Sequence, residues 1–236
     1  MLLCAFAPRC ETLLFIGDSI TDGNWGSPVG WPCPSDKRSQ TDLNHIYGHG
    51  FVEMIAARVQ SEHPDSGYIF HNRGISGNTL ANLEQRWDTD ALSLTPDVVS
   101  ILIGTNDVNE WLASAGDTQF NYADWETRLR NLLDRTRRQN PGVKLVLCTP
   151  FVAPTGRVGS DPDYAKRAAA IANLDRIIAR VSADYSATLI DFNQMITDLY
   201  RSYPNVAPSY WIWDGIHPTP ATHYRMAQLW LATVKF

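Results

Sequence analysis

The sequence predicts an α/β fold, a three-layer α/β/α sandwich with a central, about five-stranded parallel sheet. Short apolar, β-branched runs alternate with amphipathic helical patterns along the chain. The runs are almost unbroken, which is typical of strands buried on both faces. No internal repeat, low-complexity tract or linker divides the 236 residues. We therefore expect a single domain over residues 1–236, with residues 1–11 as an N-terminal tail.

Five apolar runs predict the strands of this sheet. They are residues 12–16, 68–71, 98–103, 144–148 and 188–191. Each run is four to six residues long, as expected for buried strands. The strands are therefore predicted to alternate with helices and to lie parallel.

Helical spacing of apolar residues fills the intervals between the runs. The first stripe is Phe51, Ile55 and Val59; the second is Trp125, Leu129, Leu132 and Leu133; the third is Ala168, Ile171, Leu174, Ile178 and Val181. A last helix is predicted to begin near Pro220. These stripes are expected to be core contacts. The longest irregular segment, residues 24–47, is expected to shape a site or contact another subunit, or to be a plain surface excursion.

Composition narrows the possible partners. The formal charge of −5 argues against nucleic acid or an anionic membrane, and no stretch approaches the roughly 20 apolar residues of a membrane span. The four cysteines show no paired spacing and leave the redox compartment open. Residues 5–7, Ala-Phe-Ala, resemble the end of a signal peptide, so the sequence leans toward a secreted or periplasmic protein without deciding the compartment.

Four short blocks carry the chemistry. They are Gly17-Asp18-Ser19-Ile20, Gly74-Ile75-Ser76-Gly77-Asn78, Gly104-Thr105-Asn106-Asp107 and Asp214-Gly215-Ile216-His217-Pro218. A serine becomes a nucleophile when an imidazole takes its proton and a carboxylate orients that imidazole. Ser19, His217 and Asp214 fit these three roles. The first three blocks each follow a predicted strand, so the sheet should bring them to one site.

Hydrolysis of an ester also requires donors for the negative charge that develops on the carbonyl oxygen. The backbone N–H groups of Ser19 and Gly77 and the side-chain amide of Asn106 are the candidates. Taken alone, each block is also typical of a turn or a helix cap. Their order and their positions at strand ends together favour an ester hydrolase.

Rival motifs are excluded by sequence. Ser76 lacks the Gly-x-Ser-x-Gly pattern of a nucleophile elbow because Asn78 stands where the last glycine belongs. There is no phosphate-binding loop and no zinc signature. We therefore expect no metal and no cofactor.

The four blocks resemble those of the SGNH hydrolases, also called GDSL esterases and lipases. The resemblance implies a flavodoxin-like fold, a nucleophile at Ser19, an oxyanion hole at Ser19, Gly77 and Asn106, and an acid–base pair at Asp214 and His217. Isoleucine replaces the leucine of the family name in the first block. Within the family, the phrases around Ser19, Gly77 and His217 look most like the bacterial carbohydrate-esterase branch that includes acetylxylan esterases.

This likeness implies a serine-dependent carboxylic ester hydrolase that removes short acyl groups, acetyl foremost, from a carbohydrate such as xylan or xylo-oligosaccharides. Trp25, Trp31 and Trp213 are candidate substrate contacts, although tryptophans fill cores and subunit contacts equally well. A homo-oligomer is possible. The alternatives are a lysophospholipase or thioesterase of the same family and a catalytically silent carbohydrate-binding relative.

Overall fold

The structure is a computed structural model that describes residues 11–24, 33–34, 37–38, 46–114 and 118–235. Almost all of the predicted N-terminal tail therefore lies outside the described residues. Trp25 and Trp31, two of the three candidate substrate contacts, also lie outside them.

Five parallel strands form one sheet, as the sequence predicts. They are β1 (Thr12–Gly17), β2 (Ile69–Gly74), β3 (Val98–Leu102), β4 (Lys144–Cys148) and β5 (Thr188–Ile190). Their order across the sheet is β2-β1-β3-β4-β5. Gly17, the last residue of β1, pairs with Gly74 on one side and with Leu102 on the other.

Burial differs between central and edge strands. All residues of β3 are buried, and β1 is buried from its second residue onward. In β2, however, exposed or half-buried residues alternate with buried ones, because this strand lies at the sheet edge and a helix layer covers it less completely. The expectation of complete burial on both faces is thus wrong for β2, where His71 and Arg73 are half-buried.

Helices occupy the intervals between the strands. The α-helices are α1 (Ser19–Asp22), α2 (Phe51–Glu62), α3 (Leu80–Asp90), α4 (Thr105–Ser114), α5 (Tyr122–Gln139), α6 (Gly156–Gly159), α7 (Tyr164–Asp184), α8 (Phe192–Ser202) and α9 (Pro220–Thr233). Two 3₁₀ turns, η2 (Leu92–Leu94) and η3 (Pro208–Tyr210), complete the described elements. The predicted apolar stripes of α2 and α5 are buried. On α7 the stripe is also buried except at Ala168, whose place in the core is taken by Ala170.

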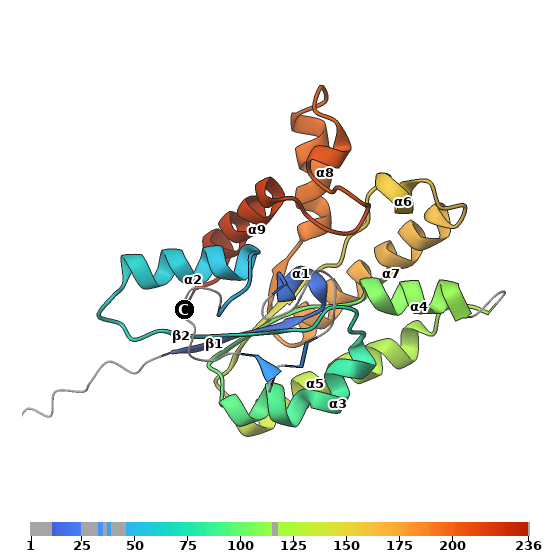
Figure 1. The fold of residues 1–236 in the computed structure, drawn as a ribbon. Helices are drawn as coiled ribbons and strands as arrows, with labels where there is room; N and C mark the ends of the chain where they lie inside the picture. Colours follow the sequence, from blue (N-terminus) through green and yellow to red (C-terminus); the bar gives the residue numbers. More distant parts are fainter. Residues whose placement is uncertain (1–10, 25–32, 35–36, 39–45, 115–117, 236) are drawn as a thin grey trace, which may run out of the picture.

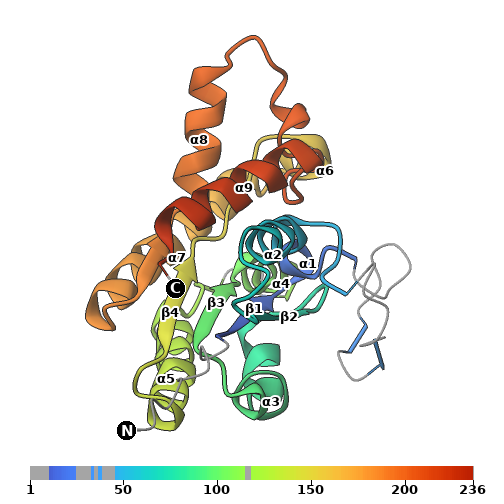
Figure 2. The same cartoon turned by 90° about the vertical axis from the view of Figure 1, so that its left-hand side faces the viewer.

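The helices form two layers around the sheet (Figures 1 and 2). Helices α2, α8 and α9 pack on one face over a core that includes Phe15, Phe51 and Trp230. Helices α3, α5 and α7 pack on the other face over a core that includes Trp87 and Leu174. The three-layer α/β/α class predicted from the sequence is therefore confirmed.

The strand order determines where a ligand binds. The chain adds β2 on one side of β1 and then β3 on the other, so the connections diverge between β1 and β3. Ligands of such sheets bind at this switch point, beyond the carboxyl ends of the strands. The residues after β1 and β3 are those of the Ser19 and Asn106 blocks. Within the described residues, no helix has the length and apolarity needed to traverse a bilayer.

Candidate active site

Ser19 is the first residue of α1, directly after the end of β1. The side chain of Asp18 caps this short helix, because its Oδ1 accepts the Ile20 N–H at 3.0 Å. Ser19 N–H stands at the start of the helix, where no preceding helical carbonyl is available to accept it. The strand, the cap and the helix therefore hold both the hydroxyl and the N–H of Ser19 at the sheet's carboxyl edge.

Asp214 and His217 lie in the loop that precedes α9. Asp214 Oδ1 accepts the backbone N–H groups of Ile216 at 3.0 Å and His217 at 2.8 Å. Its Oδ2 lies 2.8 Å from Nδ1 of the His217 ring. The spacing of three residues thus lets one carboxylate organise the loop and orient the imidazole at the same time.

The His217 ring joins this loop to α1. Its Nε2 lies 2.9 Å from Ser19 Oγ. A carboxylate can only accept hydrogen bonds, so Nδ1 carries the proton and Nε2 accepts the Ser19 hydroxyl. The structure brings together Ser19, His217 and Asp214 in the order hydroxyl, imidazole, carboxylate.

Close packing holds the Asp214 loop against the segment that contains α6. Gly215 has a φ of +96°, and a Cβ there would lie 2.4 Å from Val158 Cβ. The backbone of this loop bonds to the same segment, through Ala153 N–H to Gly215 O at 2.9 Å. Burial acts to raise the pKa of Asp214, but the hydrogen bonds from His217 and Ile216 outweigh it and hold the pKa well below its usual range. Asp214 is therefore an anion whenever the protein is folded near neutral pH.

Gly77 and Asn106 lie beside Ser19 on the wall of the same cavity. Gly77 has a φ of +82°, and no atom lies within 4 Å of the Cβ it lacks. Asn106, in the first turn of α4, donates from Nδ2 to Asn78 O at 3.2 Å. An amide group carries two N–H donors, so this bond leaves a second one for a ligand.

Sequence reasoning missed Asn109, which fixes the Asn106 amide. Asn109 Nδ2 donates to Asn106 Oδ1 at 3.3 Å, and the guanidinium of the buried Arg167 donates to Asn109 Oδ1. The signal was available in the spacing, because Asn106 and Asn109 are three residues apart on one helix and so share a face. Arg167, on α7, could not have been linked to them without the fold.

The cavity over these residues has a volume of about 640 Å³. Its wall includes Ser19, Gly77, Asn106, Trp213 and His217. Trp213 is 60% exposed, and its ring lies roughly parallel to the His217 ring with centroids 6.4 Å apart. Of the three predicted substrate contacts, Trp213 thus lies at the cavity.

Two further titratable groups near the serine have shifted pKa values. Burial raises the pKa of Asp18 to about 7, against the effect of its bond from Ile20. Burial, together with the nearby His217, lowers the pKa of His223, on the cavity wall, to about 4. His223 Nδ1 accepts the Phe51 N–H at 3.2 Å, so the neutral ring carries its proton on Nε2.

Ser76 also lines the cavity but is held in a different way. Its hydroxyl donates to Asp22 Oδ2 at 2.8 Å. This bond gives Ser76 a carboxylate partner in place of a histidine. Within the described residues, no three His, Cys, Asp or Glu side chains converge as they would around a metal ion.

The chain resembles proteins whose names describe esterases. It is 30% identical over 234 residues to an acetylxylan esterase of Geobacillus stearothermophilus, which covers 96% of this chain and 94% of that protein. It is 26% identical over 184 residues to a multidomain esterase of Ruminococcus flavefaciens, covering 71% of this chain and 21% of that protein.

Solved structures show the same fold. A catalytic mutant of the Geobacillus acetylxylan esterase superposes with a TM-score of 0.75 at 27% identity, covering 96% of this chain and 94% of that one. An α/β hydrolase enzyme from the metagenome of Lake Arreo, Spain, gives a TM-score of 0.75 at 28% identity, covering 94% of each chain. Residues 15–225 match the model of the GDSL-like lipase/acylhydrolase family. The chain therefore belongs to this family and is a carboxylic ester hydrolase.

Proposed function

We propose that the protein removes short acyl groups, acetyl foremost, from a carbohydrate such as xylan or a xylo-oligosaccharide, through an acyl-enzyme on Ser19. The observation that carries this proposal is the continuous chain of hydrogen bonds from the Ser19 hydroxyl through His217 to Asp214. In this arrangement the neutral imidazole of His217 is placed to take the serine proton. The ionised carboxylate of Asp214 is placed to stabilise the imidazolium that results.

Acylation begins with attack of Ser19 Oγ on the ester carbonyl carbon. The hydroxyl proton passes to His217 Nε2 as the new C–O bond forms, and the carbonyl oxygen becomes an oxyanion. His217 then returns the proton to the sugar oxygen as the ester C–O bond breaks. The sugar leaves as an alcohol and the acyl group stays on Ser19.

Deacylation repeats these steps with water as the nucleophile. His217 Nε2 takes a proton from a water molecule, whose oxygen attacks the acyl carbon and generates a second oxyanion. Collapse of this intermediate returns the proton to Ser19 Oγ and releases the carboxylic acid. We assign the Ser19 and Gly77 N–H groups and the Asn106 amide to the oxyanion in both steps.

The comparison with the Geobacillus esterase supports this assignment of roles. Three of its solved structures are catalytic mutants in which a serine, an aspartate or a histidine is replaced by alanine. The aspartate and the histidine are three positions apart in that protein, as Asp214 and His217 are here. That protein is called an acetylxylan esterase, which is the source of our choice of acyl group and sugar.

The cavity wall supports a polyhydroxylated substrate. Most of its described residues carry polar side chains, including His49, Asn109, Arg157 and His223. The exposed Trp213 ring, which lies roughly parallel to the His217 ring, offers a flat apolar face of the kind on which sugar rings stack. The polar groups can bond sugar hydroxyls and the ring can stack on a sugar, while the apolar part of the wall is open to an acyl group.

A second hollow of about 460 Å³ adjoins this cavity. Asn109, Arg157 and Ile216 line both spaces. Binding sites for small molecules generally enclose their ligand in a volume of about 300–1,000 Å³. The two hollows together therefore offer room for more than one sugar unit.

Hydrolysis rates across defined esters test the proposal. We expect kcat/KM to be highest for p-nitrophenyl acetate and to fall steadily for the butanoate and octanoate, and acetate to be released from acetylated xylose and faster from acetylated xylotriose. Ser19→Ala should lower kcat by on the order of 10⁵-fold, because the hydroxyl acts only in the chemistry.

Three results would contradict this assignment. Faster release of fatty acid from a lysophospholipid than of acetate from xylotriose acetate would favour the lysophospholipase alternative. A fluorophosphonate that modified a peptide containing Ser76, and left Ser19 free, would assign the nucleophile elsewhere. Loss of activity on every ester with retained binding of xylotriose would indicate a carbohydrate-binding protein.

A further inference from the structure

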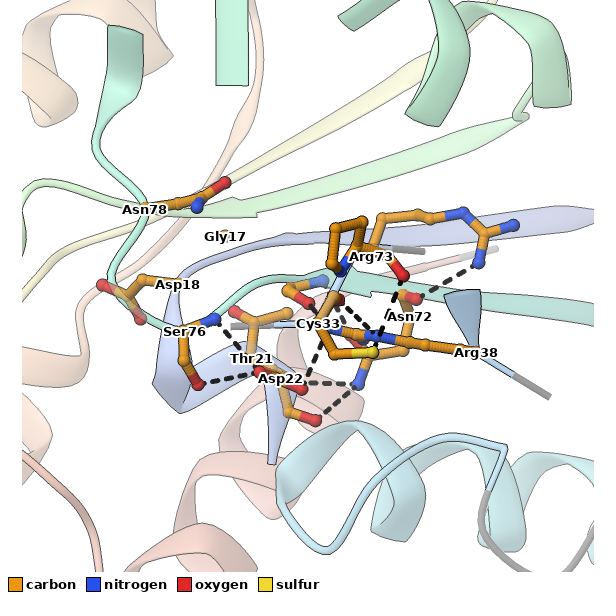
Figure 3. A network of polar contacts seen from close by, with 12 residues as sticks. Gly17, Asp18, Thr21, Asp22, Cys33, Arg38, Asn72, Arg73, Ser76 and Asn78 are labelled. Atoms are coloured by element: carbon orange, nitrogen blue, oxygen red, sulfur yellow. Dashed lines mark hydrogen bonds and ion pairs between the residues drawn. The ribbon is translucent and has the colours of Figure 1, made fainter. Parts of the chain in front are cut away.

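Asp22 links α1 to the segment that carries Gly77. It is the last residue of α1, one helical turn after Ser19, and its side chain is fully buried. Asp22 Oδ2 accepts both the N–H of Ser76 at 3.0 Å and the hydroxyl of Ser76 at 2.8 Å. Figure 3 shows this carboxylate between Ser76 on one side and Arg38 on the other. The residue before Gly77 is thus bonded twice to the helix that begins with Ser19.

Arg38 is the counterion of this carboxylate. Its Nη2 lies 3.3 Å from Asp22 Oδ1, and both side chains are completely buried. The same guanidinium donates to Gly74 O at 2.8 Å and, through Nε, to Cys33 O at 2.8 Å. Removing one member of a buried pair leaves an uncompensated charge, so Asp22 and Arg38 depend on each other.

Asn72 completes the attachment of α1 to β2. Its Nδ2 donates to the carbonyl oxygens of Thr21 at 2.8 Å and Tyr47 at 2.9 Å, while its Oδ1 accepts the N–H of Gly74 at 2.9 Å. At Gly74 a Cβ would lie only 2.3 Å from Asp22 N. The helix therefore packs directly on the end of the strand, with no side chain between the two backbones.

We propose that Asp22, neutralised by Arg38, is a positioning residue that fixes the Ser19 N–H and the Gly77 N–H relative to each other as a pair of oxyanion donors. The proposal rests on the function proposed above. Ser19 lies at one end of α1 and Asp22 at the other, and Asp22 bonds to the neighbour of Gly77.

This role follows from the geometry that transition-state stabilisation demands. Preorganised donors are effective because they need no rearrangement when the oxyanion forms. A displacement of about 1 Å in such a site can lower the rate about a hundredfold. Gly77 has no side chain with which to hold itself against its surroundings, so its position depends on bonds made by its neighbours.

The proposal also gives a function to part of the excursion after the nucleophile. Arg38 belongs to residues 24–47, the segment whose role the sequence leaves open. Through Arg38 this segment supplies the positive charge that lets a carboxylate be buried beside the site. The contribution of Arg38 to the reaction is thus expected at the oxyanion.

Asp22→Asn tests the proposal, because asparagine keeps the shape and loses the charge. We expect kcat and kcat/KM for p-nitrophenyl acetate to fall by the same factor, about tenfold to a hundredfold, as for an interaction made only in the transition state. The inhibition constant of a simple alkylboronic acid, whose tetrahedral serine adduct places an oxygen at the oxyanion position, should rise by a similar factor.

A double-mutant cycle with Arg38→Gln tests the pairing. The double variant should lose no more activity than the worse single variant, because each change already breaks the pair. Ser76→Ala removes only the hydroxyl bond and should lower kcat less, by about threefold to tenfold. If Asp22→Asn does not fold, Ser76→Ala decides the question by the same two measurements.

Thr136→Ala is the matched control for lost stability. Thr136 is buried on α5, where it bonds to Trp87 Nε1 at 3.1 Å, away from the cavity wall. Thr136→Ala should lower Tm while kcat and the inhibition constant of the boronic acid stay unchanged. Folded Asp22→Asn with wild-type kcat, or folded Ser76→Ala with wild-type kcat and boronic acid affinity, would overturn the proposal.

The failure of the proposed function has a different signature. In that case the wild-type protein itself would not be inhibited by the boronic acid, or Ser19→Ala would keep its activity. A wild-type enzyme that depends on Ser19 and binds the boronic acid, with Asp22 variants that are indistinguishable from it, would instead contradict only the role of Asp22.

Discussion

Asn109 donates a hydrogen bond from its side-chain amide to Oδ1 of Asn106 over 3.3 Å. Since Oδ1 is occupied as an acceptor, the NH₂ group of Asn106 is turned toward Asn78 and the cavity. The amide that we assign to the oxyanion is therefore oriented before any substrate binds. Preorganisation of this kind distinguishes a catalytic donor from an asparagine that merely lies near a ligand.

Asn106→Ala should lower kcat by about 10²- to 10³-fold with little change in KM, because its donor binds a charge that exists only in the transition state. Steady-state kinetics on p-nitrophenyl acetate measure both constants. Asn109→Ala should give a smaller loss of kcat, since it removes the orientation and keeps the donor. A change mainly in KM would assign Asn106 to substrate binding.

Asp214→Asn should lower kcat by about 10³- to 10⁴-fold and leave measurable residual activity, because the amide keeps the shape without the charge that stabilises the imidazolium. Asp65→Asn provides the matched control, since Asp65 is exposed and outside the cavity wall. If both variants kept the wild-type kcat, Asp214 would be a structural residue of its loop.

Asp18 is expected to make stability depend on pH. Its folded-state pKa is raised to about 7 by burial, so the unfolded chain releases this proton at lower pH than the folded protein does. The free energy of unfolding should therefore fall between about pH 4 and pH 7, at about 1.4 kcal/mol per pKa unit.

Asp18→Asn removes this pH dependence of the free energy of unfolding. The amide keeps an oxygen that can accept the Ile20 N–H. The variant should have nearly the wild-type Tm at pH 4 and a Tm higher by about 10 °C at pH 8, since about three pKa units correspond to about 4 kcal/mol. Thermal unfolding at several pH values measures the difference between the two proteins. A difference that does not change with pH would show that Asp18 is ionised in the folded protein throughout the range.

Trp213→Ala should raise KM for acetylated xylotriose by about tenfold and leave kcat on p-nitrophenyl acetate within about twofold, because a stacking face of about 1–2 kcal/mol is used only by the sugar. Trp213→Phe, which keeps a ring, should restore part of the loss. An equal loss on both substrates would indicate that the ring acts through His217, against which it lies.

The strands were predictable because burial on both faces requires short, almost unbroken apolar runs in the sequence. The run at 144–148 coincides with β4, and the run at 12–16 differs from β1 by one residue. The edge strand β2 was less well predicted, since it begins one residue and ends three residues after its apolar run. Half-buried positions such as His71 and Arg73 carry no apolar signal.

The candidate serine, histidine and carboxylate could be selected from the sequence because the four blocks occur in order and three of them follow predicted strands. The residues that hold these side chains and the neighbouring Gly77 segment in place could not be predicted. Asp22, Arg38 and Ser76 are individually typical of turns and loops, and only the fold places a carboxylate from α1 against the end of β2. Likewise Trp125 fits an apolar stripe, although its Nε1 donates to Asp107 Oδ1 at 3.0 Å.

The separation of Ser19 from His217 by 198 positions has a consequence for synthesis of the chain. The five strands of the sheet precede His217, so the sheet can form on the ribosome before the histidine that we propose as the base has been made. An unactivated hydroxyl is a weak nucleophile. A nascent chain that has not yet placed His217 is therefore expected to be inactive toward esters, and catalytic activity would report that the loop before the last helix has docked on the sheet.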